Sequence, residues 1–303
     1  MKKIIYTTTI FATLLTGCNF LDDNPQGIMT EKEAISKADE LVTTAYSSLG
    51  NDHYDVPFSL WIYGNVRADD AYKGGQDVSD IQHFHFYEIA QNIDPTFGEA
   101  DRFWFMCYMA ISRTNTALKA LQQASDAEVA NRQSRMGEMY FLRGHFYFVL
   151  KTIFGHIPFV DENTPDSAYE TTPNTLPNDE QWQKIVADFK KAYDLLPNTQ
   201  PQKGRADKYA AAAYLAKAYL YKAYRQSENN SVTGINSQDL QEVLTYTSFA
   251  LGSSYGLEDD FAFNFLPGGY ENGKESMFAV QYSVDDGTQY GRLNWGDQLS
   301  APQ

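Results

Sequence analysis

The segment "GEMYFLRGHFYFVLKTIFGHIPFV", residues 137–160, decides the fold. Its aromatic and aliphatic side chains recur at helical spacing as far as Phe154. Gly155 follows as the expected C-cap of the helix, and Pro158 keeps the residues before it extended. The segment therefore predicts a long aromatic helix that ends at residue 154.

Two more helices are predicted on the N-terminal side of this segment. Thr30 and Glu33 form a capping box, which marks the start of a helix. Its apolar face carries Ala34, Ala38, Leu41, Ala45 and Leu49. A second helix, over about residues 101–124, has its apolar face at Trp104, Tyr108, Ile111, Leu118 and Leu121.

Three further helices are predicted on the C-terminal side. In the first, Asn178 and Gln181 are the expected N-terminal caps and Pro197 is the stop. Its apolar face comprises Trp182, Ile185, Phe189, Tyr193 and Leu196. The next helix lies within residues 203–223, and Ser237 opens another that ends near Gly252.

The helices contain a recurring pair of a small residue and a tyrosine three positions later. Gly144 precedes Tyr147 in this way, and Ala216 precedes Tyr219, as in tetratricopeptide helices where two backbones must approach closely. The fold class predicted from this pattern is all-α, an α-α superhelix of tetratricopeptide-like helix pairs over about residues 101–252, decorated with long loops.

Two stretches, residues 50–100 and 253–303, lack helical periodicity. In the second, "ESMFAVQYS" (275–283) alternates as a strand does, and Asp286 with Gly287 offers a turn, which together predict a short β-hairpin.

The N-terminus has the layout of a secretory signal: Lys2 and Lys3, then about a dozen mostly apolar residues, then small residues. The apolar run is too short to span a bilayer, which takes roughly 20 residues. Leu15 to Cys18 resemble the lipobox of bacterial lipoproteins, so residues 1–17 are interpreted as a lipoprotein signal peptide and Cys18 as the lipidation site. The alternative is an ordinary signal with an incidental cysteine.

The composition excludes some classes of partner and of stabilisation. The formal net charge is −15, and removal of Lys2 and Lys3 with the signal makes it −17. Nucleic acid is an unsuitable partner, because phosphate binding needs a basic stripe that this chain lacks. Cys107 is the only other cysteine, so no intrachain disulfide is expected in the mature chain, and its apolar surroundings predict a buried, inert thiol.

Several segments together resemble the SusD/RagB family of outer-membrane nutrient-binding lipoproteins. These are the lipobox followed by "NFLDDNP" (19–25), "RFWFMCYMAISRTNTAL" (102–118), the 137–160 segment, "FKKAYDLLP" (189–197), "GRADKYAAAAYLAKAYLY" (204–221) and "ESMFAVQYS". They occur in the family's order, and the run from Arg143 to Pro158 is the most specific of them. The interpretation is one SusD-like domain over residues 18–303 that represents the N-terminal portion of the family.

The resemblance implies a surface-exposed protein that is lipid-anchored in the outer membrane, binds oligosaccharide and delivers it to a SusC-like TonB-dependent transporter. It implies no catalysis and no cofactor. Two alternatives stay open: a helical-repeat scaffold that binds a peptide or protein partner, and a glycoside hydrolase, which would need two carboxylates about 5–9.5 Å apart.

The first candidate site is the loop in "RADDAYKGGQDVSDIQHFHFYEI", residues 67–89. A ring can cover the C–H face of a sugar, and carboxylates and amides can pair with its hydroxyls. The resemblance places ligand contacts at Asp70, Tyr72, Gln76 and Asp77. The alternative is a solvated loop whose acids cap turns.

The second candidate is "TQYGRLNWGDQLSAPQ", residues 288–303, with Tyr290, Asn294 and Trp295 as ligand contacts. Trp61 and Tyr63 are interpreted as core residues. His83 and His85 are expected on one face of a strand, but no further metal ligand stands at a telling spacing, so neither a metal site nor a catalytic residue is predicted.

Overall fold

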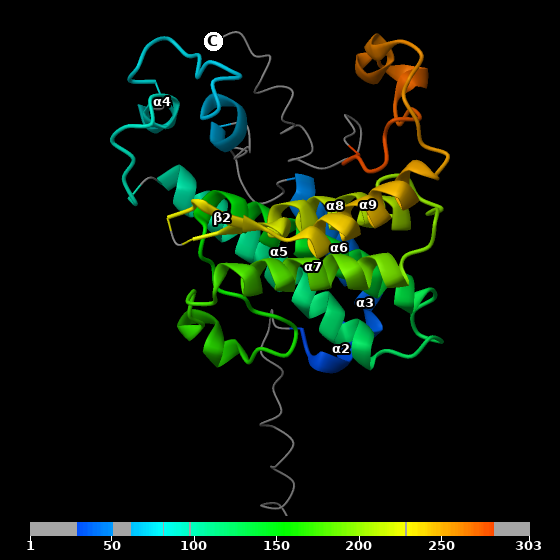
Figure 1. Cartoon of the computed structure of the whole chain (residues 1–303). Helices are drawn as coiled ribbons and strands as arrows, with labels where there is room; N and C mark the ends of the chain where they lie inside the picture. Colours follow the sequence, from blue (N-terminus) through cyan, green and yellow to red (C-terminus); the bar gives the residue numbers. More distant parts are fainter. Residues whose placement is uncertain (1–28, 51–61, 81, 97, 228, 282–303) are drawn as a thin grey trace, which may run out of the picture.

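The computed structural model of the chain describes residues 29–50, 62–80, 82–96, 98–227 and 229–281 (Figure 1). The helices are α2 (Glu31–Ser36), α3 (Ala38–Ser47), α4 (Gln82–Glu88), α5 (Gly98–Gln123), α6 (Arg132–Phe154), α7 (Asn178–Leu195), α8 (Lys208–Ala223) and α9 (Ser237–Leu251). A short antiparallel pair joins β1 (Tyr224–Gln226) to β2 (Val232–Ile235). Single turns of 3₁₀ or π-helix occupy Ser48–Gly50, Ile62–Val66, Asp166–Thr171, Phe261–Phe265 and Gly268–Tyr270.

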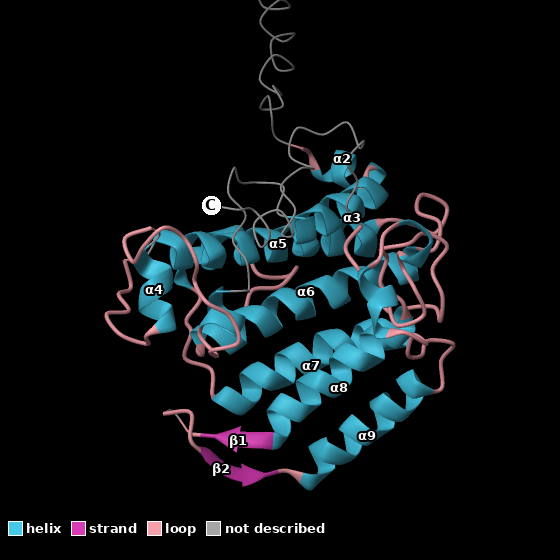
Figure 2. Cartoon of the chain, turned by 90° about the horizontal axis from the view of Figure 1, so that it is seen from above, coloured by secondary structure: helices cyan, strands magenta, loops and turns pink. Residues whose placement is uncertain are grey.

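The long helices stack in chain order. Figure 2 shows α5, α6, α7, α8 and α9 side by side, and each one packs against the next. Near the N-terminus, α3 packs against both α5 and α6. The predicted all-α array of helix pairs is therefore confirmed.

Helix α6 lies at the centre of this array and matches the prediction from its sequence. Every side chain from Gly137 to Lys151 except His145 is buried. Gly155 caps the C-terminus with a φ of 78°, a conformation that glycine adopts without steric cost, and the Lys151 ammonium bonds to its carbonyl at 2.8 Å.

Two glycines of α6 allow α7 to approach. A Cβ atom on Gly144 would lie 3.0 Å from the Phe189 ring, and one on Gly137 would lie 3.0 Å from Leu195 Cβ. A close approach is present at Gly144, but helix α6 meets the Phe189 side chain there and not the second backbone that the sequence had predicted. The ring of Phe189 also makes an edge contact with Phe141 of α6.

A buried ion cluster connects α5, α6 and α7. The guanidinium of Arg143 on α6 donates to both oxygens of Asp188 on α7, at 2.7 and 2.8 Å. Its Nη1 donates to Asn115 Oδ1 on α5 at 2.8 Å and to Glu162 Oε2 at 2.6 Å. Each of the three charged side chains is at most a tenth exposed. Burial by itself raises the pKa of Glu162, but the charge and hydrogen bond of Arg143 outweigh it and hold that pKa below its usual value.

The side chain of Gln181 on α7 is fully buried and hydrogen-bonds to both ends of the connection from α6 to α7. Its Oε1 accepts from the Ile157 N–H at 3.2 Å, and its Nε2 donates to the Leu176 carbonyl at 2.8 Å. The prediction of Asn178 and Gln181 as helix caps was wrong. Helix α7 begins at Asn178 after Pro177, which makes no side-chain cap bond, and Gln181 serves the loop instead.

The N-terminal helix differs from its prediction at one point. The capping box of Thr30 and Glu33 is present, but the helix breaks at Lys37, where φ is −113° and ψ is 20°, into α2 and α3. The apolar spacing continues across the break, which is why periodicity alone predicted a single helix.

The stretches without helical period also differ from expectation. Residues 82–88 form α4, a short helix, where no helix was predicted. Residues 275–281 form no strand; there Met277 and Phe278 pack on the helical core, and the Phe278 ring lies 5.0 Å from that of Phe141. A hairpin that was not predicted joins β1 to β2. The turn predicted at Asp286 and Gly287 lies outside the described residues.

Among the described residues no helix is both long and apolar enough to cross a bilayer. Cys107 is buried on α5, as predicted. Burial raises the pKa of its thiol, so the side chain stays protonated and does not react as a thiolate.

The buried cluster makes a stability prediction. Arg143→Met leaves the carboxylates of Asp188 and Glu162 buried without their cation, so the free energy of unfolding should fall by about 3–5 kcal/mol. Lys190→Met is the matched control, because Lys190 pairs with Asp194 on the surface of α7 and its loss should cost below about 0.5 kcal/mol. Urea denaturation followed by circular dichroism measures both; equal losses would show that the cluster adds nothing beyond a surface pair.

Candidate functional site

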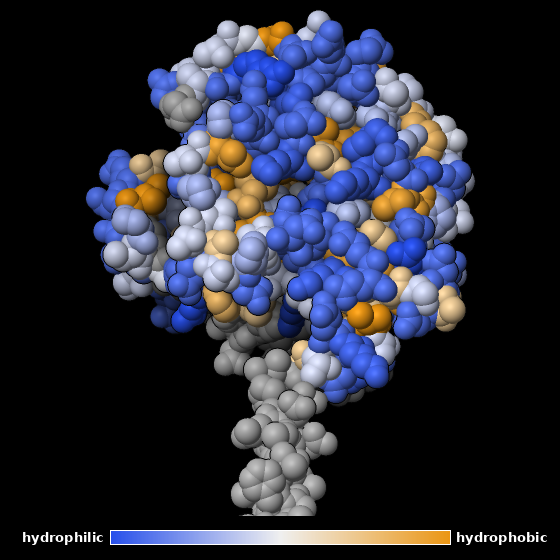
Figure 3. Space-filling model, turned by 90° about the horizontal axis from the view of Figure 1, so that it is seen from below, coloured by the Kyte–Doolittle hydropathy of each residue, from blue (hydrophilic) through white to orange (hydrophobic). Residues whose placement is uncertain are grey.

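Two segments outside the stacked helices lie on the same side of the helix array. Figure 1 shows residues 62–96, with α4, at one end of this side and residues 253–281, in orange, at the other. The opposite face is mostly hydrophilic, with small separate apolar patches (Figure 3). The side that carries both segments is therefore the candidate binding face.

The first segment stands on a small core of its own. Ile62, Val66 and Tyr87 are buried together. The Tyr63 ring lies 5.2 Å from Tyr87 and also 5.2 Å from Phe103 on α5, so it connects this small core to the array. Tyr63 is thus a packed residue, as predicted, and α4 exists because Tyr87 is buried against Ile62 and Val66.

Hydrogen bonds within the loop hold its shape. The Lys73 ammonium, which is buried, donates to the Asp77 carbonyl at 2.7 Å. Asp77 Oδ1 accepts from the backbone N–H of Ser79 at 2.7 Å and from its hydroxyl at 2.5 Å. Gly74 and Gly75 have φ of 75° and 81°, which lets the chain turn sharply between Tyr72 and Gln76.

The four residues predicted in this loop lie close together in the chain and all are exposed. Tyr72 is 82% exposed, which is unusual for a ring of this size, and Asp70 and Gln76 are open to solvent. Asp77 is also exposed, but one of its carboxylate oxygens holds the turn at Ser79. The structure therefore leaves all four residues exposed in one loop, and their ligand contacts remain a prediction.

The pKa of the Asp77 carboxyl is lowered, which favours its ionised form. The hydroxyl of Ser79, and after it the Ser79 N–H, lower the pKa of Asp77 below its ordinary value because both donate to the carboxylate. Asp77 thus remains a hydrogen-bond acceptor at a pH at which an unassisted aspartate begins to protonate.

The other predicted site residues lie outside the described residues. These are the ligand contacts Tyr290, Asn294 and Trp295, the lipidation site Cys18 and the core residue Trp61.

Sequence reasoning missed an aromatic cluster in the second segment. Leu257, Phe261 and Phe265 are 81%, 76% and 71% exposed. The signal was present in "FAFNFLPGGY", residues 261–270, where phenylalanines alternate beside proline and two glycines in a stretch without helical period.

The two histidines of the first segment do not share a strand face. His83 and His85 lie on α4, where residues two apart point to different sides of the helix, and His85 Nδ1 lies 3.3 Å from Glu88 Oε2. Within the ranges that the structure describes, no three His, Cys, Asp or Glu side chains gather in a way that could hold a metal ion.

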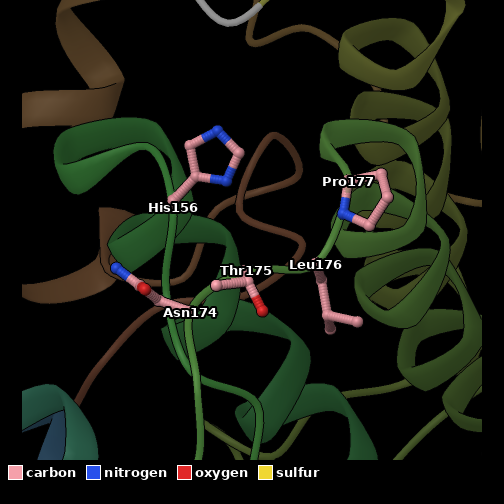
Figure 4. A pocket seen from close by; sticks show the side chains of 5 residues that line it. All are labelled: His156, Asn174, Thr175, Leu176 and Pro177. Atoms are coloured by element: carbon pink, nitrogen blue, oxygen red, sulfur yellow. The ribbon is translucent and has the colours of Figure 1, made fainter.

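A pocket of about 520 Å³ lies at the connection from α6 to α7. It is lined by His156, Asn174, Thr175, Leu176 and Pro177. Figure 4 shows the side chains of Asn174, Thr175 and Leu176 pointing in different directions, so they do not converge on one bound group. The pocket contains none of the residues that the sequence singled out.

A search of known protein families and structures places this chain among related proteins. A SusD-like family model, described as "Starch-binding associating with outer membrane", matches residues 19–220. SusD-like protein P2 of Formosa agariphila is 26% identical over 221 residues, which are 70% of this chain and 42% of that protein.

Solved structures show the same fold. Surface glycan-binding protein A from Bacteroides thetaiotaomicron, in complex with laminarihexaose, has a TM-score of 0.67 at 22% identity and covers 87% of this chain and 52% of its own. Surface glycan-binding protein A from Bacteroides uniformis has a TM-score of 0.64 at 25% identity and covers 80% of this chain and 51% of its own.

The chain spans about half the length of these relatives. Since the family model covers two thirds of the chain and the helix array is shared, the chain belongs to the SusD-like family whose description is starch-binding and associated with the outer membrane.

Proposed function

We propose that the protein binds a neutral oligosaccharide at the cell surface, with the loop around Tyr72 as a contact surface, and delivers it to a SusC-like TonB-dependent transporter. The observation that carries the proposal is the Tyr72 ring, 82% exposed on a loop that its own hydrogen bonds hold in place. Family membership supports it, as does the laminarihexaose bound to the relative from B. thetaiotaomicron.

The chemistry of the loop matches a sugar. The Tyr72 ring offers an apolar face for the C–H groups of a pyranose, and its hydroxyl can both donate and accept. The carboxylates of Asp70 and Asp77 accept hydrogen bonds from sugar hydroxyls, and the Gln76 amide can donate or accept. The formal net charge of −15 favours an uncharged ligand over an anionic one. Tyr290, Asn294 and Trp295 remain proposed as further contacts.

The protein binds the glycan without cleaving it and needs no cofactor in this proposal. Two rival functions predict different results in the same assay. A scaffold for a peptide partner would bind peptides and no glycan, and a glycoside hydrolase would release new reducing ends.

The location is proposed from the N-terminal sequence. Residues 1–17 act as a lipoprotein signal, Cys18 carries the acyl chains, and residues 18–303 form one domain held on the outer membrane and facing outward. More than one acyl chain gives stable anchoring, because each buried methylene contributes about 0.8 kcal/mol. The family's association with the outer membrane supports this proposal.

Tyr72→Ala should weaken glycan binding about tenfold or more, since it removes the exposed ring and its hydroxyl at once. Isothermal calorimetry with laminarihexaose and maltohexaose, on protein lacking residues 1–18, measures the change. Tyr224→Ala on β1 is the control, because this tyrosine is also exposed but lies outside the loop. Equal affinities for wild type and Tyr72→Ala would remove the loop from the proposal.

The contribution of Asp77 to binding should persist at pH 4 and be lost only at lower pH. The pKa of Asp77 in the folded protein is depressed below its ordinary value of 3.8, so the interaction of its carboxylate is present above that value and is lost as pH falls through the lowered pKa. Ser79→Ala should move this loss to higher pH, because the Ser79 hydroxyl is the main cause of the shift. Calorimetry between pH 7 and pH 3 tests this, with circular dichroism to confirm folding; a loss already complete at pH 5 contradicts the role of Asp77.

Cys18→Ser should move the protein from the membrane fraction to the soluble fraction, because the acyl chains then have no attachment point. Fractionation of cells followed by immunoblotting measures this. Cys107→Ser, which alters a buried thiol, should leave the distribution unchanged. A Cys18→Ser protein that stays in the membrane fraction would show that another feature anchors it.

A further inference from the structure

The aromatic cluster at Phe261 and Phe265 stands on a rigid base. Lys274 N donates to Glu258 Oε1 at 2.6 Å, and Glu258 N donates to Glu275 Oε1 at 2.7 Å, so the two ends of this loop are joined by reciprocal bonds. The Tyr255 hydroxyl donates to Asp207 Oδ2 at 2.9 Å, which attaches the base to the start of α8. Phe278 packs on Phe141 of α6 immediately after the loop.

The tip of the loop is also ordered. Asp260 caps the first 3₁₀ turn by accepting from the Ala262 N–H at 2.9 Å. The rings of Phe263 and Tyr270 lie 4.7 Å apart and hold the two 3₁₀ turns together. Phe263 and Tyr270 therefore hold the tip, while Phe261 and Phe265 are left for another contact.

The exposure of Phe261 and Phe265 indicates a binding surface. They lie four residues apart with ring centroids 5.1 Å from each other and an angle of 65° between the rings, and both are more than two-thirds exposed. Adjoining apolar side chains exposed in this way mark a binding surface more often than chance. Leu257, in the base of the loop beside Glu258, is also 81% exposed.

The charge around these rings restricts the ligand. Glu258, Asp259, Asp260 and Glu271 lie in or beside the tip, and the neighbouring cation, Lys274, is already paired with Asp259 at 2.8 Å. An anionic sugar or a phosphate would meet like charge here, whereas a neutral sugar presents C–H faces to the rings and hydroxyl donors to the carboxylates.

We propose that Phe261 and Phe265 form a second contact surface for a neutral glycan chain. The segment that carries them, residues 253–281, lies on the same side of the helix array as residues 62–96, which carry Tyr72 (Figure 1). The inference rests on the proposed function and specifies its ligand as a polymer of many sugar units. A long ligand that contacts both surfaces binds with higher affinity than either surface gives alone. A short ligand reaches only one surface, so the second surface does not change its affinity.

The test compares chain lengths. Laminarin and soluble starch are the polymer probes, and laminarihexaose and maltohexaose are the short probes, all titrated by calorimetry into protein lacking residues 1–18. The double variant Phe261→Ser/Phe265→Ser should lose about tenfold in affinity for the polymer that binds wild type, while its affinity for the matching hexaose changes less than twofold. Because both side chains are exposed, the variant should fold as wild type does by circular dichroism. The single variant Phe265→Ser gives a second, milder change of the same surface.

Leu244→Ser is the matched control, since Leu244 is 61% exposed on α9 away from the tip. Unchanged polymer affinity in the double variant, with binding still lost in Tyr72→Ala, overturns the second surface and leaves the proposed function standing. A second outcome also overturns the proposal: light scattering shows that wild type self-associates, while the double variant is monomeric and keeps its polymer affinity. The surface would then bind a second copy of the chain. No binding of any of the four probes to wild type contradicts the proposed function itself.

Discussion

The buried guanidinium of Arg143 is the constraint on which the arrangement of the helices depends. A charge in a core is tolerated only if every donor finds an acceptor, and here the acceptors come from three other elements: Asn115 of α5, Asp188 of α7 and Glu162 of the loop after α6. These elements can hardly slide relative to one another, because a shift would leave charged groups buried without partners. Gly144, one residue further on, lets Phe189 approach closely enough for the pair with Asp188 to form.

The rigid array leaves the two exposed segments free to serve binding. The segment around Tyr72 is attached through Tyr63 to Phe103, and the segment around Phe261 is attached through Tyr255 and Phe278. Each segment then closes on itself by short-range hydrogen bonds to carboxylates, of Asp77 in one and Glu258 in the other. Ordering the loops in advance lowers the entropy that a ligand would otherwise have to offset on binding.

Both exposed segments combine an exposed aromatic ring with several aspartate or glutamate side chains. This combination suits uncharged molecules that carry many hydroxyl groups. Carboxylates that are already ionised and partly hydrogen-bonded, such as Asp77, can accept further hydrogen bonds from hydroxyls. The exposed rings add contact area with little loss of side-chain entropy, since a tyrosine or phenylalanine has only two rotatable side-chain bonds. Relatives about twice as long as this chain share its helix array, so the array is the part of the family's fold that this sequence contains.

The sequence by itself determined the long helices from α5 to α9, and the C-terminal ends of α6, α7 and α9 to within about two residues, because helical period and breakers such as Gly155 and Pro197 act over a few residues. It also placed Asp70, Tyr72, Gln76 and Asp77 in one exposed loop. Only the tertiary structure decided the break at Lys37, the helix α4, the pairing of β1 with β2 and the use of Gln181 in the loop after α6. It alone paired Arg143 with Asp188 and left Phe261 and Phe265 in solvent. The physical reason is the sequence separation of the interacting residues. Short elements, buried polar pairs and the exposure of a ring depend on contacts between segments far apart in the chain, and the local spacing of residue types does not determine those contacts.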